Sequence, residues 1–287
     1  MHILITDSGV GGLSVVAYAE RFVRTQGYRE PVQLTFANAA PANDYGYNSM
    51  PTREEKLETF SRFLGNVTDR FQPDMIYVAC NTLSVLLPDT PYFATAKIPV
   101  KGIVGTGVEV LMRELERNRD ATAIIFATPT TIDAGTYPRM LEERGVDPSR
   151  IISQACPGLA DVISEDREGA RTAEEVRKWV RIASDKLAKP DSSVVACLAC
   201  THYGYRKDQF SAAFADGGID AKIVNPNEHA VNDLFDSPEN IHSSEVQFIT
   251  RYRIPDATID ALTYFLSNIS PTTVEAMRRF RHDPDLF

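Results

Sequence analysis

The chain has 287 residues but only four cysteines, and it lacks any long run of apolar residues. Four cysteines are too few for the disulfide framework of a small secreted domain, so we expect free thiols in a reducing compartment. No apolar run reaches the roughly 18–20 residues that a membrane-spanning helix needs. The first residues indicate a strand rather than a signal peptide. Together these absences predict a cytoplasmic protein without a membrane span.

Basic clusters are also missing. Lys and Arg number 30 against 39 Asp and Glu, the formal net charge is −9, and no run of Lys or Arg stands out. This balance argues against nucleic acid or an anionic membrane as the main partner. What the chain does have is a hydrophobic content of 43%, enough for a sizeable core in one large domain or two of ordinary size.

Short apolar runs alternate with amphipathic stretches along the chain. This alternation predicts an α/β protein with mostly parallel sheets flanked by helices. The expected strands are residues 3–6, 33–37, 75–79, 100–103, 123–127, 151–154, 194–198 and 222–224. The expected helices are residues 13–24, 53–71, 107–118, 131–144, 172–187, 205–214 and 231–235, with two more at 259–266 and 272–280.

One pattern occurs twice. An apolar strand ends in Ala79-Cys80 and another in Ala199-Cys200, and small polar residues follow each cysteine. The segments 5–9 and 126–130, which open the two halves, also resemble each other. Two matched features in the same order predict duplicated halves. Open α/β sheets bind ligands at the carboxyl ends of their strands, so facing halves would place both cysteines on one cleft.

A glycine-rich turn, Asp7-Ser8-Gly9-Val10-Gly11-Gly12, follows the first strand. A nucleotide-binding loop is the obvious alternative, but these glycines do not fit Gly-x-Gly-x-x-Gly and no Gly-Lys-Ser/Thr follows. We expect the glycines to let a helix N-terminus approach a small anion. Asp7 is then available to act on a neighbouring group, and the less favoured alternative is that it caps the helix.

Cys80 directly follows a strand and precedes a helix. A helix N-terminus favours the thiolate, and Asn81 and Thr82 add hydrogen-bond donors there. The pattern thus predicts a nucleophile or base that could share its pocket with a carboxylate. The alternative is that Cys80 only fills space, because free cysteines are often buried.

Cys197 and Cys200 form a Cys-x-x-Cys pair. One such pair is at best half a zinc site, and residues three apart on a strand point to opposite faces. We therefore predict that Cys197 lies in the core and that Cys200 is exposed at the strand tip. Cys156 is expected to pack. His202 can exchange a proton with Cys200 or orient it, although a lone His in a turn more often makes a local hydrogen bond.

Three motifs together resemble the glutamate racemase family, within the aspartate/glutamate racemase superfamily. They are DSGVGGLSV at residues 7–15, ACNT at 79–82 and CTHY at 200–203, and the similarity extends through roughly residues 1–230. The resemblance implies two pseudo-symmetric α/β domains with the active site in the cleft between them. Residues 1–100 with 216–287 would form the first domain, and residues 101–215 the second.

The resemblance also implies a mechanism and a set of site residues. Cys80 and Cys200 would serve as opposed acid/base thiols, Asp7 would assist Cys80, and His202 would assist Cys200 with an acid that we place at Glu165. The residues expected to hold the substrate are Ser8, Tyr45, Gly46, Asn81, Thr82, Thr128 and Thr201. The implied reaction interconverts L- and D-glutamate, a source of peptidoglycan precursors for the cell wall. It needs no cofactor and no metal. We expect the chain to bind an amino-acid substrate and to form a homodimer.

Several positions depart from the family pattern. The loop before Tyr45 lacks the usual Arg and has Asp44 in place of Pro, Gly204 replaces a common Pro, and the tail from Ile241 is unlike the usual ending. Because an acid near a bound γ-carboxylate would repel it, the alternative is a racemase or epimerase of the same superfamily with another substrate. His202 favours the glutamate branch, since aspartate racemases usually have an acid there. A second alternative is a non-catalytic amino-acid-binding relative.

Overall fold

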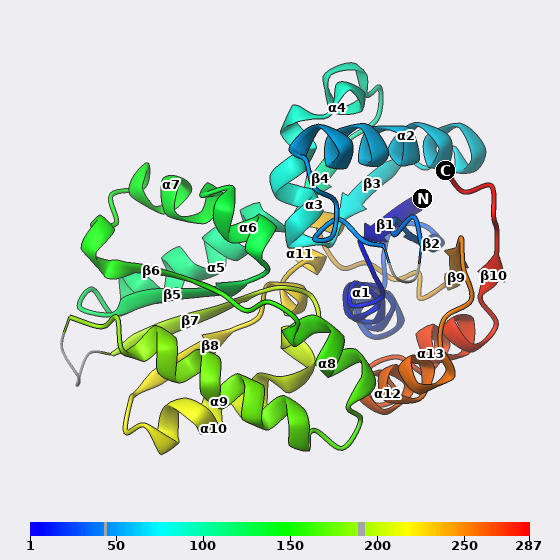
Figure 1. The fold of residues 1–287 in the computed structure, drawn as a ribbon. Coiled ribbons are helices and arrows are strands. Elements are labelled where there is room, and N and C mark those ends of the chain that lie inside the picture. Colours follow the sequence, from blue (N-terminus) through cyan, green and yellow to red (C-terminus); the bar gives the residue numbers. More distant parts are fainter. Residues whose placement is uncertain (43–44, 189–192) are drawn as a thin grey trace. The chain divides into compact units, whose positions relative to one another are not determined.

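The computed structural model describes residues 1–42, 45–188 and 193–287 (Figure 1). These residues form two compact units. Unit 1 contains Met1–Ile103 and Asn227–Phe287, and unit 2 contains Val104–Pro226. Both units are α/β and both sheets have parallel strand pairs throughout the described residues. The predicted fold class is confirmed.

The sheet of unit 1 has six strands in the order β10-β9-β2-β1-β3-β4. Its central strands are apolar and buried along almost their whole length, as expected for parallel strands covered on both faces. The strands are β1 (His2–Asp7), β2 (Val32–Asn38), β3 (Met75–Val78), β4 (Val100–Gly102), β9 (Ser244–Thr250) and β10 (Arg281–His282).

Two groups of helices cover this sheet. In Figure 1, α2, α3 and α4 lie on one side of it and α1, α12 and α13 on the other. The bounds are α1 (Leu13–Gln26), α2 (Arg53–Phe71), α3 (Asn81–Leu86), α4 (Pro91–Thr95), α11 (Val231–Leu234), α12 (Asp256–Leu266) and α13 (Pro271–Arg278), with 3₁₀ turns at Leu87–Asp89 and Pro226–Glu228. The start of α2 matches its prediction because the Thr52 side chain accepts a hydrogen bond from the Glu55 amide, as in a capping box.

Unit 2 repeats this design on a smaller scale. Its sheet has the order β6-β5-β7-β8, with β5 (Thr122–Ala127), β6 (Ile151–Ala155), β7 (Val194–Ala199) and β8 (Ala221–Val224). The helices are α5 (Ile103–Arg117), α6 (Pro129–Asp133), α7 (Thr136–Glu142), α8 (Leu159–Glu165), α9 (Ala170–Ser184) and α10 (Lys207–Asp216), with 3₁₀ turns at Pro148–Arg150 and Tyr203–Arg206. Helices α8, α9 and α10 share one apolar core with β5 and β7.

The two sheets share a four-strand order. The order β2-β1-β3-β4 in unit 1 corresponds to β6-β5-β7-β8 in unit 2. In this correspondence β3, which precedes Cys80, matches β7, which precedes Cys200. The structure therefore agrees with the duplication that the repeated Ala-Cys pattern suggested.

Several sequence-based boundaries differ from the structure. The helix predicted at residues 131–144 is wrong as one element, because Gly135 at φ 61° separates α6 from α7. Residues 216–226 were grouped with the first domain, but β8 pairs with β7 and so belongs to unit 2. Strand β9 was not predicted.

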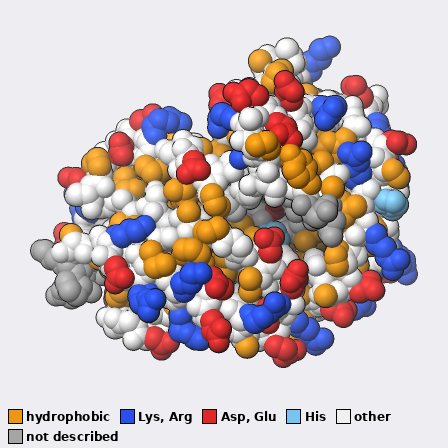
Figure 2. Space-filling model, in the orientation of Figure 1, with side chains coloured by type: hydrophobic (Ala, Val, Ile, Leu, Met, Phe, Trp, Pro, Cys, Tyr) orange, Lys and Arg blue, Asp and Glu red, His pale blue; other side chains and the backbone are white. Residues whose placement is uncertain are grey.

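The surface carries charges of both signs. Acidic and basic side chains are interspersed over the face that Figure 2 shows. None of the helices in the described part of the chain is both long enough and apolar enough to cross a lipid bilayer.

Candidate active site

The first polar cluster lies at the carboxyl ends of β1 and β3, which are neighbours in the sheet of unit 1. We call Asp7, Ser8, Cys80, Asn81 and Thr82 the Cys80 cluster. The Ser8 hydroxyl lies 3.0 Å from the Cys80 sulfur and donates weakly to the Asp7 carboxylate at 3.5 Å. Asp7 and Cys80 are only 1% and 5% exposed. A hydroxyl thus connects a buried carboxylate with a buried thiol.

The turn at Cys80 is held by local hydrogen bonds. Cys80 is the N-cap of α3, and its carbonyl accepts the amide of Ser84 at 2.8 Å. The Ser84 hydroxyl donates to the carbonyl of Val78 at 3.0 Å and accepts the amide of Ile103 at 3.1 Å. These bonds tie the start of α3 to the ends of β3 and β4. They fix the direction in which Cys80 leaves the sheet.

Burial determines the protonation of Cys80. Burial and, to a lesser extent, the negative charge of Asp7 raise the pKa of the thiol to about 12. The Ser8 hydroxyl and two backbone amides act in the opposite direction but do not compensate. The influence of the helix start that we expected to favour the thiolate is therefore outweighed, because desolvation of the charge has a larger effect than a six-residue helix.

Gly12 makes room for Asp7. A Cβ atom at Gly12 would lie 2.8 Å from both the Cβ and the Oδ2 of Asp7 and 3.1 Å from the Cβ of Ala79. Gly12 is also the N-cap of α1. The glycine-rich turn thus serves the packing of a buried acid at this position.

The second polar cluster lies at the carboxyl ends of β5 and β7, which pair in unit 2. We call Thr128, Thr131, Cys200, Thr201 and His202 the Cys200 cluster. The hydroxyls of Thr128 and Thr131 lie 3.1 Å apart. All five side chains are buried, and Cys200 is only 7% exposed. The prediction of an exposed Cys200 is wrong, because the turn that follows it folds back over the strand end.

That turn is a 3₁₀ helix held by Tyr203. The Tyr203 amide donates to the Cys200 carbonyl at 3.1 Å, and its hydroxyl donates to the Cys156 carbonyl at 3.2 Å. A Cβ atom at Gly204 would lie 2.4 Å from the side-chain nitrogen of the buried Asn225. Gly204, where the family commonly has Pro, therefore accommodates Asn225.

The other two cysteines lie in the core of unit 2. Cys197 is fully buried on β7 and Cys156 is 1% exposed, as predicted for packing residues. Burial raises the pKa of Cys197 to about 12 and that of Cys156 still higher. Among the described residues, no group of three or more His, Cys, Asp or Glu side chains is arranged to hold a metal ion.

Two further expected site residues, Tyr45 and Glu165, have exposed side chains. Tyr45 is 38% exposed, and its hydroxyl donates to Glu55 at 2.5 Å, while Gly46 follows it on the same loop. The Glu165 side chain is 62% exposed at the end of α8, 3.9 Å from Arg171. This position gives Glu165 no buried contact through which to orient an imidazole. Asp44 lies outside the described residues.

Sequence reasoning missed two polar residues beside Asp7. Asn38 ends β2 in register with Asp7, is fully buried, and donates to the Tyr252 hydroxyl at 3.1 Å. The signal for Asn38 was available, since it is a polar residue at the end of an apolar strand, like Asp7 itself. Tyr252 follows β9, which was not predicted.

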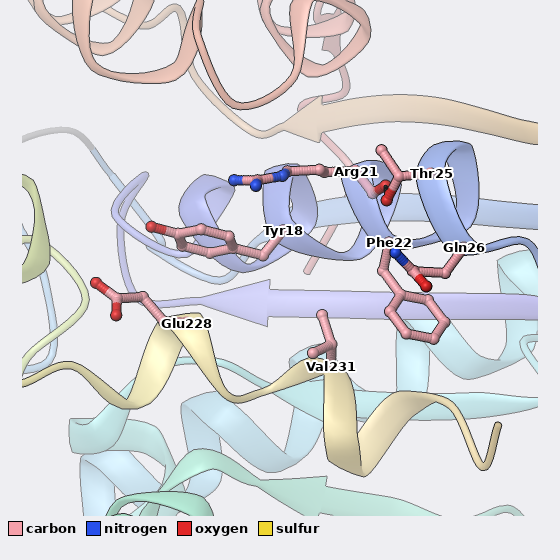
Figure 3. Close-up of a pocket in the computed structure, with 7 residues that line it drawn as sticks. All are labelled: Tyr18, Arg21, Phe22, Thr25, Gln26, Glu228 and Val231. Atoms are coloured by element: carbon pink, nitrogen blue, oxygen red, sulfur yellow. Dashed lines mark hydrogen bonds between the residues drawn. The ribbon is translucent and has the colours of Figure 1, made fainter. Parts of the chain in front are cut away.

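A separate hollow lies on unit 1, along the second half of α1. Its volume is about 460 Å³, and Figure 3 shows its lining. The lining residues are Tyr18, Arg21, Phe22, Thr25, Gln26, Glu228 and Val231. None of them belongs to the Cys80 cluster, which lies at the other end of α1.

Comparisons with known proteins agree with the sequence motifs. The chain matches no protein-family model. It is 29% identical to the glutamate racemase of Aquifex pyrophilus over 217 residues, which cover 75% of this chain and 76% of the relative. It is 27% identical to that of Campylobacter jejuni over 253 residues, 86% of this chain and 91% of the relative.

Solved structures support the same relationship at the level of the fold. The glutamate racemase of C. jejuni superposes with a TM-score of 0.74 at 22% identity, covering 93% of this chain and 98% of that one. The A. pyrophilus enzyme gives a TM-score of 0.69 at 23% identity, with 95% and 97% covered. The resemblance inferred from the motifs is thereby confirmed: the chain is similar in sequence to glutamate racemases and shares their fold.

Proposed function

We propose that this chain is a cofactor-independent glutamate racemase that uses Cys80 and Cys200 as its two acid/base thiols. The observation that carries the proposal is the matched position of the two cysteines. Each is a buried thiol directly after the corresponding strand of one of two sheets with a common strand order. A protein that only binds an amino acid has no need for such a pair.

The chemistry requires one base and one acid. A thiolate takes the α-proton and becomes a thiol, which leaves a planar carbanion whose charge spreads into the α-carboxylate. The second thiol then delivers its proton to the opposite face of the α-carbon and becomes the thiolate. The net result is inversion at the α-carbon with no net proton change, and the two thiols exchange roles in the reverse direction.

Each thiol has neighbours suited to these roles. In the Cys80 cluster, Asp7 and Ser8 assist the thiol, and Asn81 and Thr82 offer donors to the substrate's carboxylate. In the Cys200 cluster, His202 lies two residues from the thiol, and Thr128 and Thr201 supply hydroxyls. The raised pKa of Cys80 suits it to the role of proton donor in one direction of the reaction, with Cys200 as the base in that direction.

Glutamate is the substrate that we propose. What supports it is the name shared by the relatives and a related structure from Francisella tularensis, TM-score 0.70 at 20% identity, described as a complex with D-glutamate. His202 also favours the glutamate branch of the superfamily. Tyr45, Gly46 and Glu165 enter the proposal only through the resemblance.

The test is deuterium incorporation at the α-carbon in deuterated water, scanned across L- and D-amino acids. The proposal expects exchange from both glutamate enantiomers, with little exchange from other amino acids. Exchange confined to a different amino acid would show that this amino acid, and not glutamate, is the substrate. Binding without exchange would identify a non-catalytic relative. Activity should survive dialysis against a chelator and treatment with borohydride, since the proposed chemistry uses neither metal nor pyridoxal phosphate.

We also propose a cytoplasmic homodimer. Four free cysteines support the cytoplasm, because thiols stay reduced there. The dimer is tested by size-exclusion chromatography with light scattering, which should give twice the 31.9 kDa mass of the chain. A monomeric mass for the active enzyme would contradict it.

A further inference from the structure

Tyr47 is a buried tyrosine whose hydroxyl has no hydrogen-bond partner among the described residues. The side chain is 1% exposed. A turn closed by the Ser49 amide and the Gly46 carbonyl at 2.9 Å holds its backbone, and its ring packs edge-on against Phe60 of α2, with ring centroids 6.1 Å apart. The residue is therefore well fixed, yet its polar atom is left unsatisfied.

Such an arrangement destabilises the folded protein. A buried hydroxyl without a partner loses its hydrogen bonds to water and gains none in return. Phenylalanine would fill the same space, make the same contact with Phe60 and avoid this loss. The hydroxyl of Tyr47 therefore calls for an explanation in terms of a state other than the ligand-free one.

The surroundings of Tyr47 indicate that state. Burial raises the pKa of Tyr47 well above its usual value, and the next largest influence is a charge on Cys80. The positive charge of Arg62, on α2, acts in the opposite direction. Tyr47 therefore remains a neutral phenol at neutral pH and can donate its proton. It packs on α2, while Cys80 is the N-cap of α3, and these two helices contact each other, so the phenol and the thiol belong to neighbouring elements.

We propose that the Tyr47 hydroxyl is the hydrogen-bond donor reserved for the thiolate form of Cys80, directly or through one bound water. This inference rests on the proposed function, in which Cys80 must carry a negative charge during part of each cycle. While Cys80 is protonated, the phenol has nothing to stabilise. When the sulfur becomes charged, the donor offsets the burial and the repulsion from Asp7. Tyr47 is thus a positioning residue that acts through Cys80.

The charged and polar groups around Cys80 set the expected size of the effect. Asp7, from β1, disfavours the thiolate, while the Ser8 hydroxyl, 3.0 Å from the sulfur, favours it. One further donor to a charged group in a poorly solvated site changes the protonation equilibrium by about tenfold. Removing the Tyr47 hydroxyl should therefore raise the pKa of Cys80 by about one unit.

The experiment compares the wild-type protein with Tyr47→Phe. The rate of Cys80 alkylation by iodoacetamide, followed by peptide mass spectrometry from neutral to alkaline pH, should fall about tenfold in the variant. Cys200 in the same sample is the internal reference and should react unchanged. The melting temperature should rise, because a buried unsatisfied hydroxyl is removed. The kcat for glutamate should fall while KM changes little.

Tyr77→Phe is the matched control. Tyr77 is fully buried on β3, but its hydroxyl donates to Asp233 at 3.1 Å. This variant should melt at a lower temperature and leave the alkylation of Cys80 unchanged. A lower melting temperature for Tyr47→Phe with unaltered Cys80 reactivity would show a purely structural hydroxyl and overturn the inference.

Alkylation does not depend on turnover, so the two proposals fail separately. If the wild type racemises glutamate but Tyr47→Phe leaves Cys80 reactivity unchanged, this inference is wrong and the proposed function stands. If no amino acid is racemised but Cys80 alkylation slows in the variant, the donor role stands and the proposed function fails.

Discussion

The Cys80 and Cys200 clusters occupy corresponding positions in two sheets but obtain their polar neighbours in different ways. Cys80 receives its carboxylate from a neighbouring strand, since Asp7 ends β1 and Cys80 follows β3. Cys200 has His202 two residues further along the same turn. The backbone differs accordingly, with an α-helix after Cys80 and a 3₁₀ helix after Cys200.

This difference shows how a repeated scaffold can carry two unlike thiols. The strand order determines where each thiol lies, while its burial and the groups packed around it determine its charge. Around Cys80, burial and Asp7 disfavour the thiolate, and the donors that oppose them come from separate elements. The proposed reaction needs one thiol protonated and the other deprotonated, and these surroundings suit Cys80 to the protonated role.

The largest expected effect tests whether both clusters are needed. Cys80→Ser and Cys200→Ser should each abolish racemisation and leave the fold intact, because a serine hydroxyl is too weak an acid to take a thiol's place. Cys156→Ala and Cys197→Ala should stay active and lose about 1 kcal/mol of stability through lost packing. Activity assays and urea unfolding check both pairs. An inactive Cys197→Ala with an active Cys200→Ser would reverse the assignment within the Cys-x-x-Cys pair.

A glycine substitution tests the strand-derived carboxylate of the Cys80 cluster. In Gly12→Ala the new Cβ would lie 2.8 Å from Asp7, so the carboxylate must move. A displacement of about 1 Å near a reacting group can cost on the order of a hundredfold in rate, and kcat should fall by that amount. Gly65→Ala is the control, because Gly65 lies within α2 with no atom in the way and should if anything gain stability. Full activity in Gly12→Ala would remove Asp7 from the mechanism.

A smaller change in kcat is expected for Glu165, the acid that the resemblance assigns to Cys200 and His202. Because the Glu165 side chain is exposed and near Arg171, Glu165→Gln should change kcat by less than about threefold, the range of an exposed ion pair. Steady-state kinetics of the variant is the measurement. A loss of several hundredfold would restore the catalytic role that the family resemblance gives to Glu165 and would mean that α8 moves when substrate binds.

A different kind of effect concerns stability at alkaline pH. A thiol with a higher pKa in the folded protein stabilises the fold below its unfolded pKa and loses this contribution as pH rises toward the folded value. For Cys80 and Cys197 this range runs from about 8.5 to about 12. Each thiol should then contribute a slope of about 1.4 kcal/mol per pH unit. Urea unfolding of Cys197→Ala over this range should show a shallower decline than the wild type, and an equal slope would contradict the shift.

The sequence predicted most elements of the fold because its signals are local. All eight expected strands are present, and Arg53–Phe71 was predicted to the residue, because apolar runs and the Thr52 cap act over short distances. Strand β9 was missed since only its last three residues are fully buried and its assignment depends on pairing with β2. The break at Gly135 depends on a positive φ angle. Any glycine can adopt such an angle, so the presence of a glycine in the sequence does not show that it does.

The part of the candidate site that was predicted from the sequence also depends on local signals. Residues at strand ends, such as Asp7, Cys80 and Cys200, follow from the positions of apolar runs. The protonation of Cys80 could not be inferred, because it depends on burial by segments distant in sequence. Tyr47 and Tyr252 gave no local signal, since a tyrosine in a loop has no characteristic pattern until its surroundings are known.

The order of strands also determines how the chain can assemble during its synthesis. Strand β2 pairs with β1 on one side and with β9 on the other, but about 200 residues separate β2 from β9 in the chain, including all of unit 2. At the ribosome's rate of about 5–20 residues per second, the open edge of β2 waits roughly 10–40 s for its partner. Unit 2 is continuous in sequence and can fold in that interval. A nascent chain of this protein therefore has an unpaired, apolar strand edge for most of its synthesis, which is the stage at which chaperone binding or aggregation would act.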